Sequence, residues 1–257
     1  MSVTQQKWPD VLWVVRHGES AGNVAREAAE AAGLHEVQLL AREMDVPLSP
    51  LGERQSAALG RWFGALPARE RPNVVLTSPY ERARRTAEIV SAAAGLDPAE
   101  ITFIADERLR EKEFGIFDRL TKAGAHEKYP EQAAYRDALG KFYHRPPGGE
   151  SWCDVILRLR SVVGTISREY RGERVLVVCH SVVVFCLRYL LEQMTETEIL
   201  DIDRDVDVAN CAVTSYEFER AAGTRGRLAL RLFNFVAPLE EDGLPVTTKK
   251  DEPVAPK

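Results

Sequence analysis

Four short runs of apolar, mostly β-branched residues place the strongest constraint on the fold of this chain. They cover residues 11–15, 74–77, 101–104 and 175–179. Segments with the apolar spacing of helices separate them, at residues 52–66, 79–94 and 150–170, and one more follows the last run, at residues 182–193. Short buried strands that alternate with helices are typical of a largely parallel sheet covered on both faces. The sequence therefore predicts an α/β protein, built as a three-layer α/β/α sandwich.

The remaining segments divide the chain into one domain, residues 1–237, and a tail. Residues 212–218 and 227–235 predict two more strands, joined by a turn at 221–224. Residues 238–257 contain Pro, Gly, Glu and Lys but few large apolar residues, which predicts a disordered tail. Residues 24–44 and 120–147 are expected to form variable cap segments. The first is rich in helix formers and fits either a flap over a site or a peripheral helix.

Composition excludes several functional classes. The net charge of −5 argues against nucleic acid or an anionic membrane as the main partner. We find no apolar stretch that could span a bilayer and no signal-peptide pattern, so a cytoplasmic protein is expected. The four cysteines match no zinc pattern and the histidines form no ligand cluster, which predicts buried thiols and no metal site. The sequence leaves the oligomeric state open, a homodimer included.

Polar residues suited to binding an anion follow the four predicted buried strands. They are Arg16, His17 and Gly18 after the first strand, Ser78 and Arg82 after the second, Glu111 after the third, and His180 and Ser181 after the fourth. Open α/β sheets bind ligands at the carboxyl ends of their strands. A lone buried histidine is usually a core residue, but two histidines and two arginines at neighbouring strand ends are hard to explain by packing. The sequence predicts a phosphate site there.

These motifs resemble the histidine phosphatase superfamily, which includes cofactor-dependent phosphoglycerate mutase and the fructose-2,6-bisphosphatase domain. The resemblance runs from about residue 11 to about residue 191. It rests on Arg16-His17-Gly18-Glu19-Ser20 with Asn23, Pro47-Leu48-Ser49 with Gly52 and Gln55, Ser78 with Arg82-Ala83 and Thr86-Ala87, Glu111, Gly149-Glu150-Ser151 and Val178-Cys179-His180. It implies a phosphoglycerate mutase-like sandwich with the site at the carboxyl ends of the strands.

The resemblance also implies a role for each of five catalytic residues. His17 attacks phosphorus and becomes a phosphohistidine. Arg16, Arg82 and a protonated His180 bind the phosphoryl oxygens and favour neutral His17, because like charges disfavour the imidazolium. Glu111 protonates the leaving oxygen and then activates water. Since cationic side chains neutralise the phosphate, neither a metal nor a cofactor is expected.

Five further residues are candidates for binding the substrate: Asn23, Ser181, Gly18, Ser78 and Glu150. Asn23 fits either an amide donor to phosphate or a helix cap. Ser78 fits a turn residue packed near the site. Glu150 fits a residue that positions His180 or Arg16, or a cap for the helix that follows. Ser181 replaces the glycine found in many family members, which bears on the substrate more than on the mechanism.

Three functions remain to be compared. Sixty-nine positions separate Glu111 from His180, the short interval of the family's phosphatases rather than the longer one of its mutases. This favours hydrolysis of a small phosphorylated metabolite over phosphoglycerate mutase-type transfer. A non-catalytic binding protein is disfavoured because the full set of catalytic side chains is present. Glu113 competes with Glu111 for the role of acid, and Glu111 is preferred from its position in the family motif.

Overall fold

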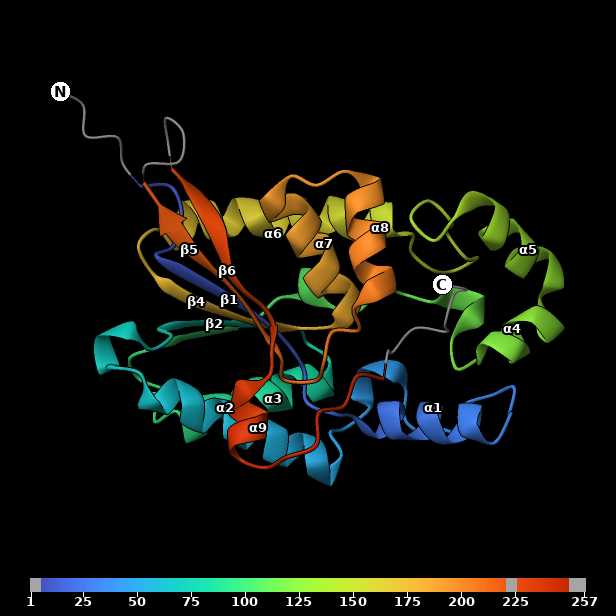
Figure 1. The fold of residues 1–257 in the computed structure, drawn as a ribbon, viewed down its shortest axis with the longest axis horizontal. Coiled ribbons are helices and arrows are strands. Elements are labelled where there is room, and N and C mark those ends of the chain that lie inside the picture. The colour runs from blue at the N-terminus through green and yellow to red at the C-terminus, as the bar shows by residue number, and fades with distance from the viewer. Residues whose placement is uncertain (1–5, 221–225, 250–257) are drawn as a thin grey trace.

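The computed structural model describes residues 6–220 and 226–249, which form a mixed sheet of six strands between layers of helices (Figure 1). The strands are β1 (Val11–Arg16), β2 (Val74–Thr77), β3 (Thr102–Ala105), β4 (Arg174–Cys179), β5 (Val213–Glu219) and β6 (Arg227–Phe235), in the spatial order β3-β2-β4-β1-β5-β6. The first four are parallel, and β5 and β6 continue the sheet in antiparallel orientation. The predicted α/β fold is confirmed.

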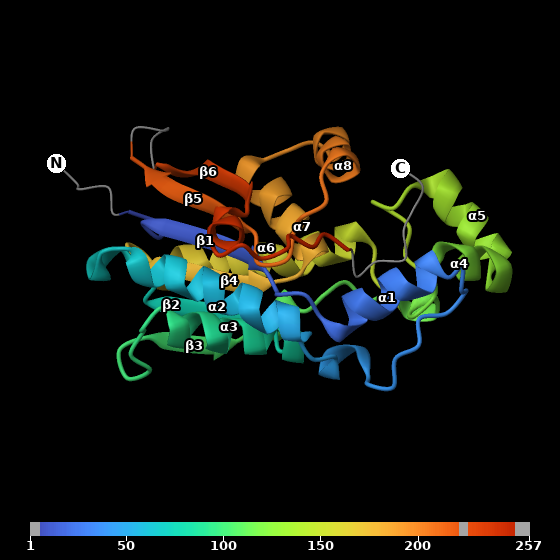
Figure 2. The ribbon, with the colours of Figure 1, turned by 60° about the horizontal axis from the view of Figure 1, so that its bottom comes forward.

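Helices cover both faces of the sheet. α2 (Pro50–Ala65), α3 (Glu81–Ala93) and the short α9 (Ala237–Glu241) lie on one face, and α6 (Trp152–Glu169), α7 (Ser181–Glu192) and α8 (Glu196–Asp205) on the other (Figures 1 and 2). Successive residues of β1 alternate between the two faces: Val14 packs in the cluster with α6 and α7, and Val15 in the cluster with α2 and α3. This two-residue period explains why a buried central strand is apolar throughout.

Local capping sets the start of several helices. The Ser49 side chain accepts from the amide of Gly52 and thereby caps α2, with Pro50 in the first turn. α6 begins with a capping box in which Ser151 and Asp154 satisfy each other's backbone amides. The helix predicted over residues 79–94 begins two residues later than expected, at Glu81, so Pro79 lies before its first turn.

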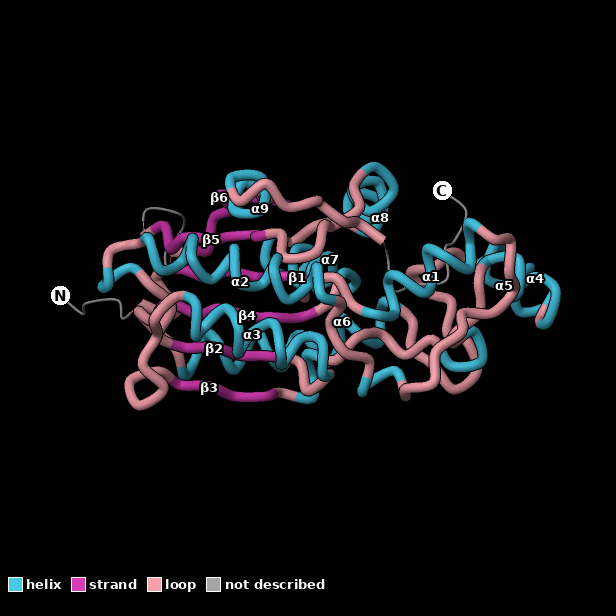
Figure 3. The backbone as a smooth tube through the Cα atoms, turned by 90° about the horizontal axis from the view of Figure 1, so that it is seen from below, coloured by secondary structure: helices cyan, strands magenta, loops and turns pink. Residues whose placement is uncertain are grey.

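The cap segments lie together beyond the carboxyl ends of the parallel strands (Figure 3). They contain α1 (Ala21–Ala31), α4 (Lys122–Lys128) and α5 (Pro130–Leu139). Residues 24–44 were predicted to be mostly helical, but the helix ends at Ala31, and Gly33 follows with a positive φ of 65°. Short 3-10 helices complete the described chain: Glu43–Asp45, Ala68–Glu70, Glu107–Leu109 and Gly115–Phe117.

The prediction of a disordered tail from residue 238 is wrong for the described part of that segment. Leu239 of α9 is fully buried, and Leu244 packs against the same cluster as α2. Two well-placed leucines therefore order a stretch that is otherwise polar. Residues 250–257 and the predicted turn at 221–224 lie outside the described residues. Among the described helices, none has the length and apolar composition needed to cross a membrane.

Candidate active site

The ends of three adjacent parallel strands bring His17, Ser78 and His180 together. The backbone amide of His17 donates to the carbonyl of Cys179 (2.9 Å), and that of Ser78 donates to the carbonyl of Val178 (3.0 Å). The sheet register therefore continues one residue beyond β1 and β2. The rings of His17 and His180 lie 5.1 Å apart between centroids, and both residues are fully buried.

Hydrogen bonds define the protonation pattern of the His17 ring. Its Nδ1 lies 2.7 Å from the carbonyl oxygen of Gly18, which can only accept, so Nδ1 carries the hydrogen. Nε2 accepts from Nε of Arg82 at 3.2 Å. The nitrogen with the lone pair is therefore Nε2, and it faces an arginine. This is the tautomer required for a nucleophilic imidazole.

Arg16 and Arg82 are almost completely buried, and each binds an oxygen of the chain itself. Arg82 donates at 2.8 Å to both the carbonyl and the carboxylate of Glu43. Arg16 donates to the carbonyl of Val208 (2.7 Å) and to that of Lys249. Guanidinium groups in such positions are suited to binding the oxygens of a phosphate.

The side-chain amide of Asn23 makes two contacts with different atoms. Ser20, not Asn23, is the N-cap of α1, and Asn23 is the third helical residue of its capping box. Its Oδ1 accepts from the backbone amide of Ser20 at 2.9 Å. Its Nδ2 donates at 3.1 Å to the carbonyl of Lys249, the same oxygen that Arg16 contacts. The amide donor is therefore held beside the arginine.

Gly18 is required by close packing. An added Cβ would lie 2.5 Å from the carbonyl oxygen of Gly52, so the absence of a side chain lets α2 approach this loop. The amide of Gly18 donates to the Thr86 hydroxyl at 3.0 Å. The loop that carries His17 is thus fixed from two helices.

Ser78 and Ser181 both adjoin His180. The Ser78 hydroxyl lies 2.8 Å from Nε2 of His180 and also accepts from the amide of Tyr80. Ser78 therefore orients the second histidine as well as forming the turn. Ser181 is buried at the first position of α7, directly after His180.

The two candidate acids occupy different environments. Glu111 is 1% exposed, and its Oε1 accepts from the amide of Lys112 at 2.8 Å. Burial, together with the negative charge of Glu111, raises the pKa of Cys179, which places this carboxylate near the end of β4. The side chain of Glu113 is 45% exposed and accepts from the Tyr80 hydroxyl. The geometry favours Glu111 as the buried acid.

Glu150 is neither the cap of α6 nor, in its described contacts, a partner of the catalytic residues. Ser151 takes the cap position. Glu150 pairs with Arg110 and Arg158 and accepts from the amide of Glu113 at 3.1 Å. Burial alone would raise its pKa, but the hydrogen bonds and charge of Arg158, the Glu113 amide and Arg110 hold it below the ordinary value. Glu150 therefore braces the loop that carries the candidate acids.

Three residues near the site were missed in the sequence. Glu43 contacts Arg82 from a cap segment. Fully buried Asn210 donates from Nδ2 to the carbonyl of His17 at 3.0 Å. The carbonyl of Lys249 contacts Arg16 and Asn23. Asn210 could have been identified in the sequence, because it is a single polar residue within an apolar stretch. The contact of Lys249 could not, because it is made by a backbone carbonyl, which every residue has.

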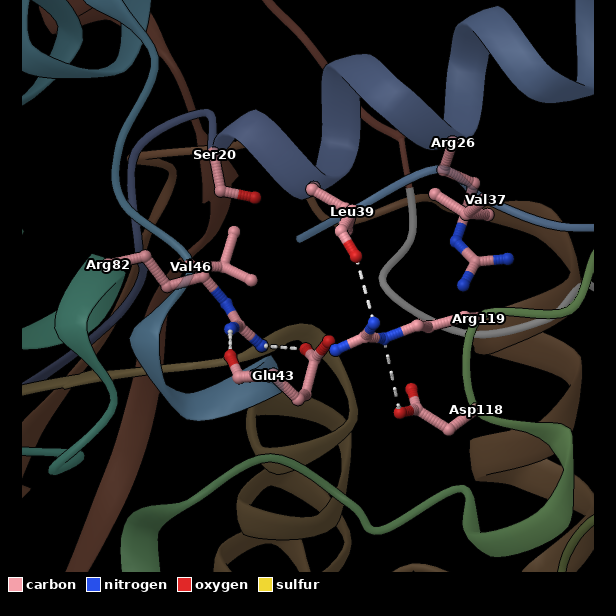
Figure 4. A pocket seen from close by; sticks show the side chains of 10 residues that line it. Ser20, Arg26, Val37, Leu39, Glu43, Val46, Arg82, Asp118 and Arg119 are labelled. Atoms are coloured by element: carbon pink, nitrogen blue, oxygen red, sulfur yellow. Dashed lines mark hydrogen bonds and ion pairs between the residues drawn. The ribbon is translucent and has the colours of Figure 1, made fainter. Parts of the chain in front are cut away.

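A pocket opens beside Arg82, between α1 and the segment that carries Glu43 (Figure 4). It encloses about 330 Å³, counting space open to solvent. Arg26 and Arg119 also line it, and Arg119 donates to the carbonyls of Leu39 (2.8 Å) and Ala41 (2.7 Å). Three arginines, Arg26, Arg82 and Arg119, therefore line this pocket.

The chemistry of the described side chains is cationic rather than metal-binding. In residues 6–220 and 226–249, no group of three or more His, Cys, Asp or Glu side chains could hold a metal ion. The four cysteines are free thiols, three of them buried. The arrangement can bind a phosphoryl group with two arginines and present an imidazole nitrogen to it.

Comparisons with known proteins agree with this geometry. Residues 12–229 match the model of the histidine phosphatase superfamily (branch 1). The chain is 30% identical over 189 residues to 6-phosphofructo-2-kinase/fructose-2,6-bisphosphatase of Gallus gallus, covering 73% of this chain but only 34% of that protein. It is 26% identical over 212 residues to a probable phosphoglycerate mutase of Salmonella paratyphi C, covering 82% of this chain and 86% of that protein.

A solved structure, Bacillus stearothermophilus YhfR, superposes with a TM-score of 0.66 at 26% identity, covering 87% of this chain and 98% of that chain. The predicted family and the fold that it implies are therefore confirmed. The chain belongs to the histidine phosphatase superfamily.

Proposed function

We propose that this protein is a metal-independent phosphatase that hydrolyses small phosphomonoesters through a phosphohistidine on Nε2 of His17. The observation that carries the proposal is the tautomer of His17. Its Nδ1 is committed to the Gly18 carbonyl, and Nε2 faces Arg82 at 3.2 Å. A neutral imidazole with this orientation is a nucleophile held next to a phosphate-binding group.

The first step transfers the phosphoryl group to the enzyme. The lone pair of His17 Nε2 forms a bond to phosphorus while the bond from phosphorus to the ester oxygen breaks. Arg16, Arg82 and His180 stabilise the charge on the three equatorial oxygens, and Asn23 adds an amide donor. Glu111 donates a proton to the leaving oxygen, which departs as an alcohol.

The second step hydrolyses the phosphoenzyme. Glu111, now a carboxylate, removes a proton from water as the water oxygen attacks phosphorus. The bond between phosphorus and Nε2 breaks, inorganic phosphate forms, and His17 regains its lone pair. Ser78 holds the His180 ring in position through both steps, at 2.8 Å.

Hydrolysis is preferred to mutase-type transfer because of the short interval between Glu111 and His180. The relative in Salmonella paratyphi C is named a probable phosphoglycerate mutase, so transfer is the second candidate. A mutase would interconvert phosphoglycerates with a bisphosphoglycerate primer faster than it releases phosphate. We expect the opposite ratio.

Phosphate release from p-nitrophenyl phosphate tests the proposal, with His17→Ala as the variant and His35→Ala as its control. His35 is a histidine of the cap that pairs with Glu127 outside the site. We expect His17→Ala to abolish turnover and His35→Ala to retain it. A trapped phosphoenzyme should be labile in acid and stable in base. Equal rates in both variants would refute the assignment of the nucleophile.

The acid role of Glu111 has a separate readout. Nitrophenolate leaves without protonation, whereas the alkoxide of glycerol phosphate requires a proton. Glu111→Gln should therefore lower the rate much more with glycerol phosphate than with p-nitrophenyl phosphate. An equal loss with both substrates would assign Glu111 to another role. A release screen over small phosphorylated metabolites, the substrate class we propose, then identifies the preferred substrate.

A further inference from the structure

Residues 244–249, here called the strap, run from the end of α9 to the candidate phosphate site (Figure 2). The strap has no regular secondary structure, yet it makes hydrogen bonds at several points. It ends at Lys249, the last residue that the structure describes. The carbonyl of that residue lies among the groups expected to bind phosphate.

Four hydrogen bonds hold the middle of the strap. The backbone amide of Asn210 donates to the carbonyl of Thr247 at 2.8 Å, and the Thr247 hydroxyl donates back to Oδ1 of Asn210 at 2.9 Å. Nε2 of Gln55 donates to the carbonyl of Pro245 (3.0 Å) and to the Thr247 hydroxyl (3.1 Å). Asn210 and Gln55 are both fully buried, so these anchors belong to the rigid body of the fold.

The end of the strap is held by charge and by the phosphate-binding groups. The ammonium of Lys249 pairs with Glu30 of α1. The carbonyl of Lys249 accepts from both Arg16 and Asn23. A phosphoryl oxygen in that position would need the same two donors, so the strap and a phosphate cannot both occupy them.

We propose that the strap is an autoinhibitory element that competes with phosphate and phosphomonoesters for Arg16 and Asn23. The inference rests on the proposed function, because it assigns those two donors to phosphate. A neutral carbonyl forms weaker hydrogen bonds with a guanidinium than a phosphate dianion does. Substrate therefore displaces the strap, and the strap closes again as inorganic phosphate leaves. The strap therefore weakens the apparent affinity for phosphate and phosphomonoesters but does not prevent turnover.

Two matched substitutions in the full-length chain test this inference. Thr247→Ala removes the hydroxyl that Asn210 and Gln55 bind. Thr248→Ala, the control, alters an exposed neighbour with no described side-chain contact. Thr247→Ala should lower KM for p-nitrophenyl phosphate about fivefold at unchanged kcat, which corresponds to about 1 kcal/mol. Thr248→Ala should match the wild type.

A second anchor and a second readout complete the experiment. Glu30→Gln removes the ion pair with Lys249 at a distance from the chemistry and should also lower KM. Titration calorimetry with inorganic phosphate should show a lower Kd for both anchor variants. A chain that ends at Leu244 keeps the leucine packed against α2 and should show the largest decrease in Kd.

The possible outcomes separate the inference from the proposed function. An unchanged or higher Kd for phosphate in Thr247→Ala, Glu30→Gln and the shortened chain would overturn the autoinhibitory role, even in an active phosphatase. A lower Kd in these variants, in a protein that hydrolyses no ester, would support the strap and overturn the proposed hydrolysis. Equal KM values for Thr247→Ala and Thr248→Ala would also count against the strap.

Discussion

Replacement of Glu43 by glutamine should strengthen phosphate binding, because Glu43 accepts hydrogen bonds from both terminal nitrogens of the Arg82 guanidinium group. Arg82 donates at 2.8 Å to the Glu43 carbonyl and, with its other terminal nitrogen, at 2.8 Å to the Glu43 carboxylate. Both nitrogens are needed for a bidentate contact with a phosphoryl group. A substrate must therefore displace this ion pair or bind beside a negative charge.

Two effects determine the magnitude. A unit charge about 8 Å from a phosphate costs about 2 kcal/mol at an effective dielectric constant of about 20. Because the side chain of Glu43 is 30% exposed, solvent reduces this to about 1 kcal/mol. Replacing a charged acceptor of Arg82 by a neutral amide weakens the competing hydrogen bond by about 0.5 kcal/mol. Together these predict a roughly tenfold lower Kd for phosphate in Glu43→Gln.

Titration calorimetry with inorganic phosphate measures the effect directly, and kcat/KM for p-nitrophenyl phosphate should rise by a similar factor. Asp45→Asn is the matched control, since it removes the same charge from the same short helix but from a residue paired with Arg42. We expect little change there. Equal changes in Kd in the two variants would mean that the loss of a negative charge near the site strengthens phosphate binding, and not the release of Arg82 from Glu43. Weaker phosphate binding in Glu43→Gln would refute the reasoning, because Glu43 would then assist the ligand.

Two predictions concern the frame around the site. Glu150→Gln should lower the free energy of unfolding by about 2 kcal/mol at pH 7, because Arg158 loses its partly buried ion-pair partner. The pKa of Glu150 in the folded state lies below its ordinary 4.5. The wild type therefore loses its extra stability over the variant only as the pH falls below about 4.5 and through the folded-state pKa. A difference in unfolding free energy between the two proteins that stays constant from pH 7 to 3, measured by urea unfolding, would contradict this. Gly52→Ala would place a Cβ 2.0 Å from the carbonyl oxygen of Glu19, and should cost at least about 2 kcal/mol and most of the activity. Gly164→Ala is the control, because only the flexible Arg168 side chain lies near that position. Equal unfolding midpoints for the two variants would contradict the prediction, because they would mean that the His17 loop can shift to accommodate the added methyl group.

The strands and the residues that follow them could be predicted because the signal is local. A buried strand requires a run of apolar residues, and the abrupt change to Arg16 and His17 marks its end. Parallel pairing then brings His17, Ser78 and His180 to one edge whatever the loops do. Glu150 was harder to interpret, since a carboxylate before a helix has the composition of a cap whether or not it caps. Only the positions of Arg110 and Arg158 decide its role.

The strap escaped prediction for a different physical reason. Composition predicts disorder where apolar burial is too small to offset chain entropy, and residues 238–257 meet that criterion on average. What orders the described part is specific: the buried side chain of Leu239, the pairing of Thr247 with Asn210, and a backbone carbonyl 233 positions from the arginine that it contacts. A main-chain oxygen is identical in every residue, so no residue type marks it as a ligand. Contacts of this kind therefore have to be found in the structure, and here they engage Arg16, a residue that the proposed function assigns to phosphate.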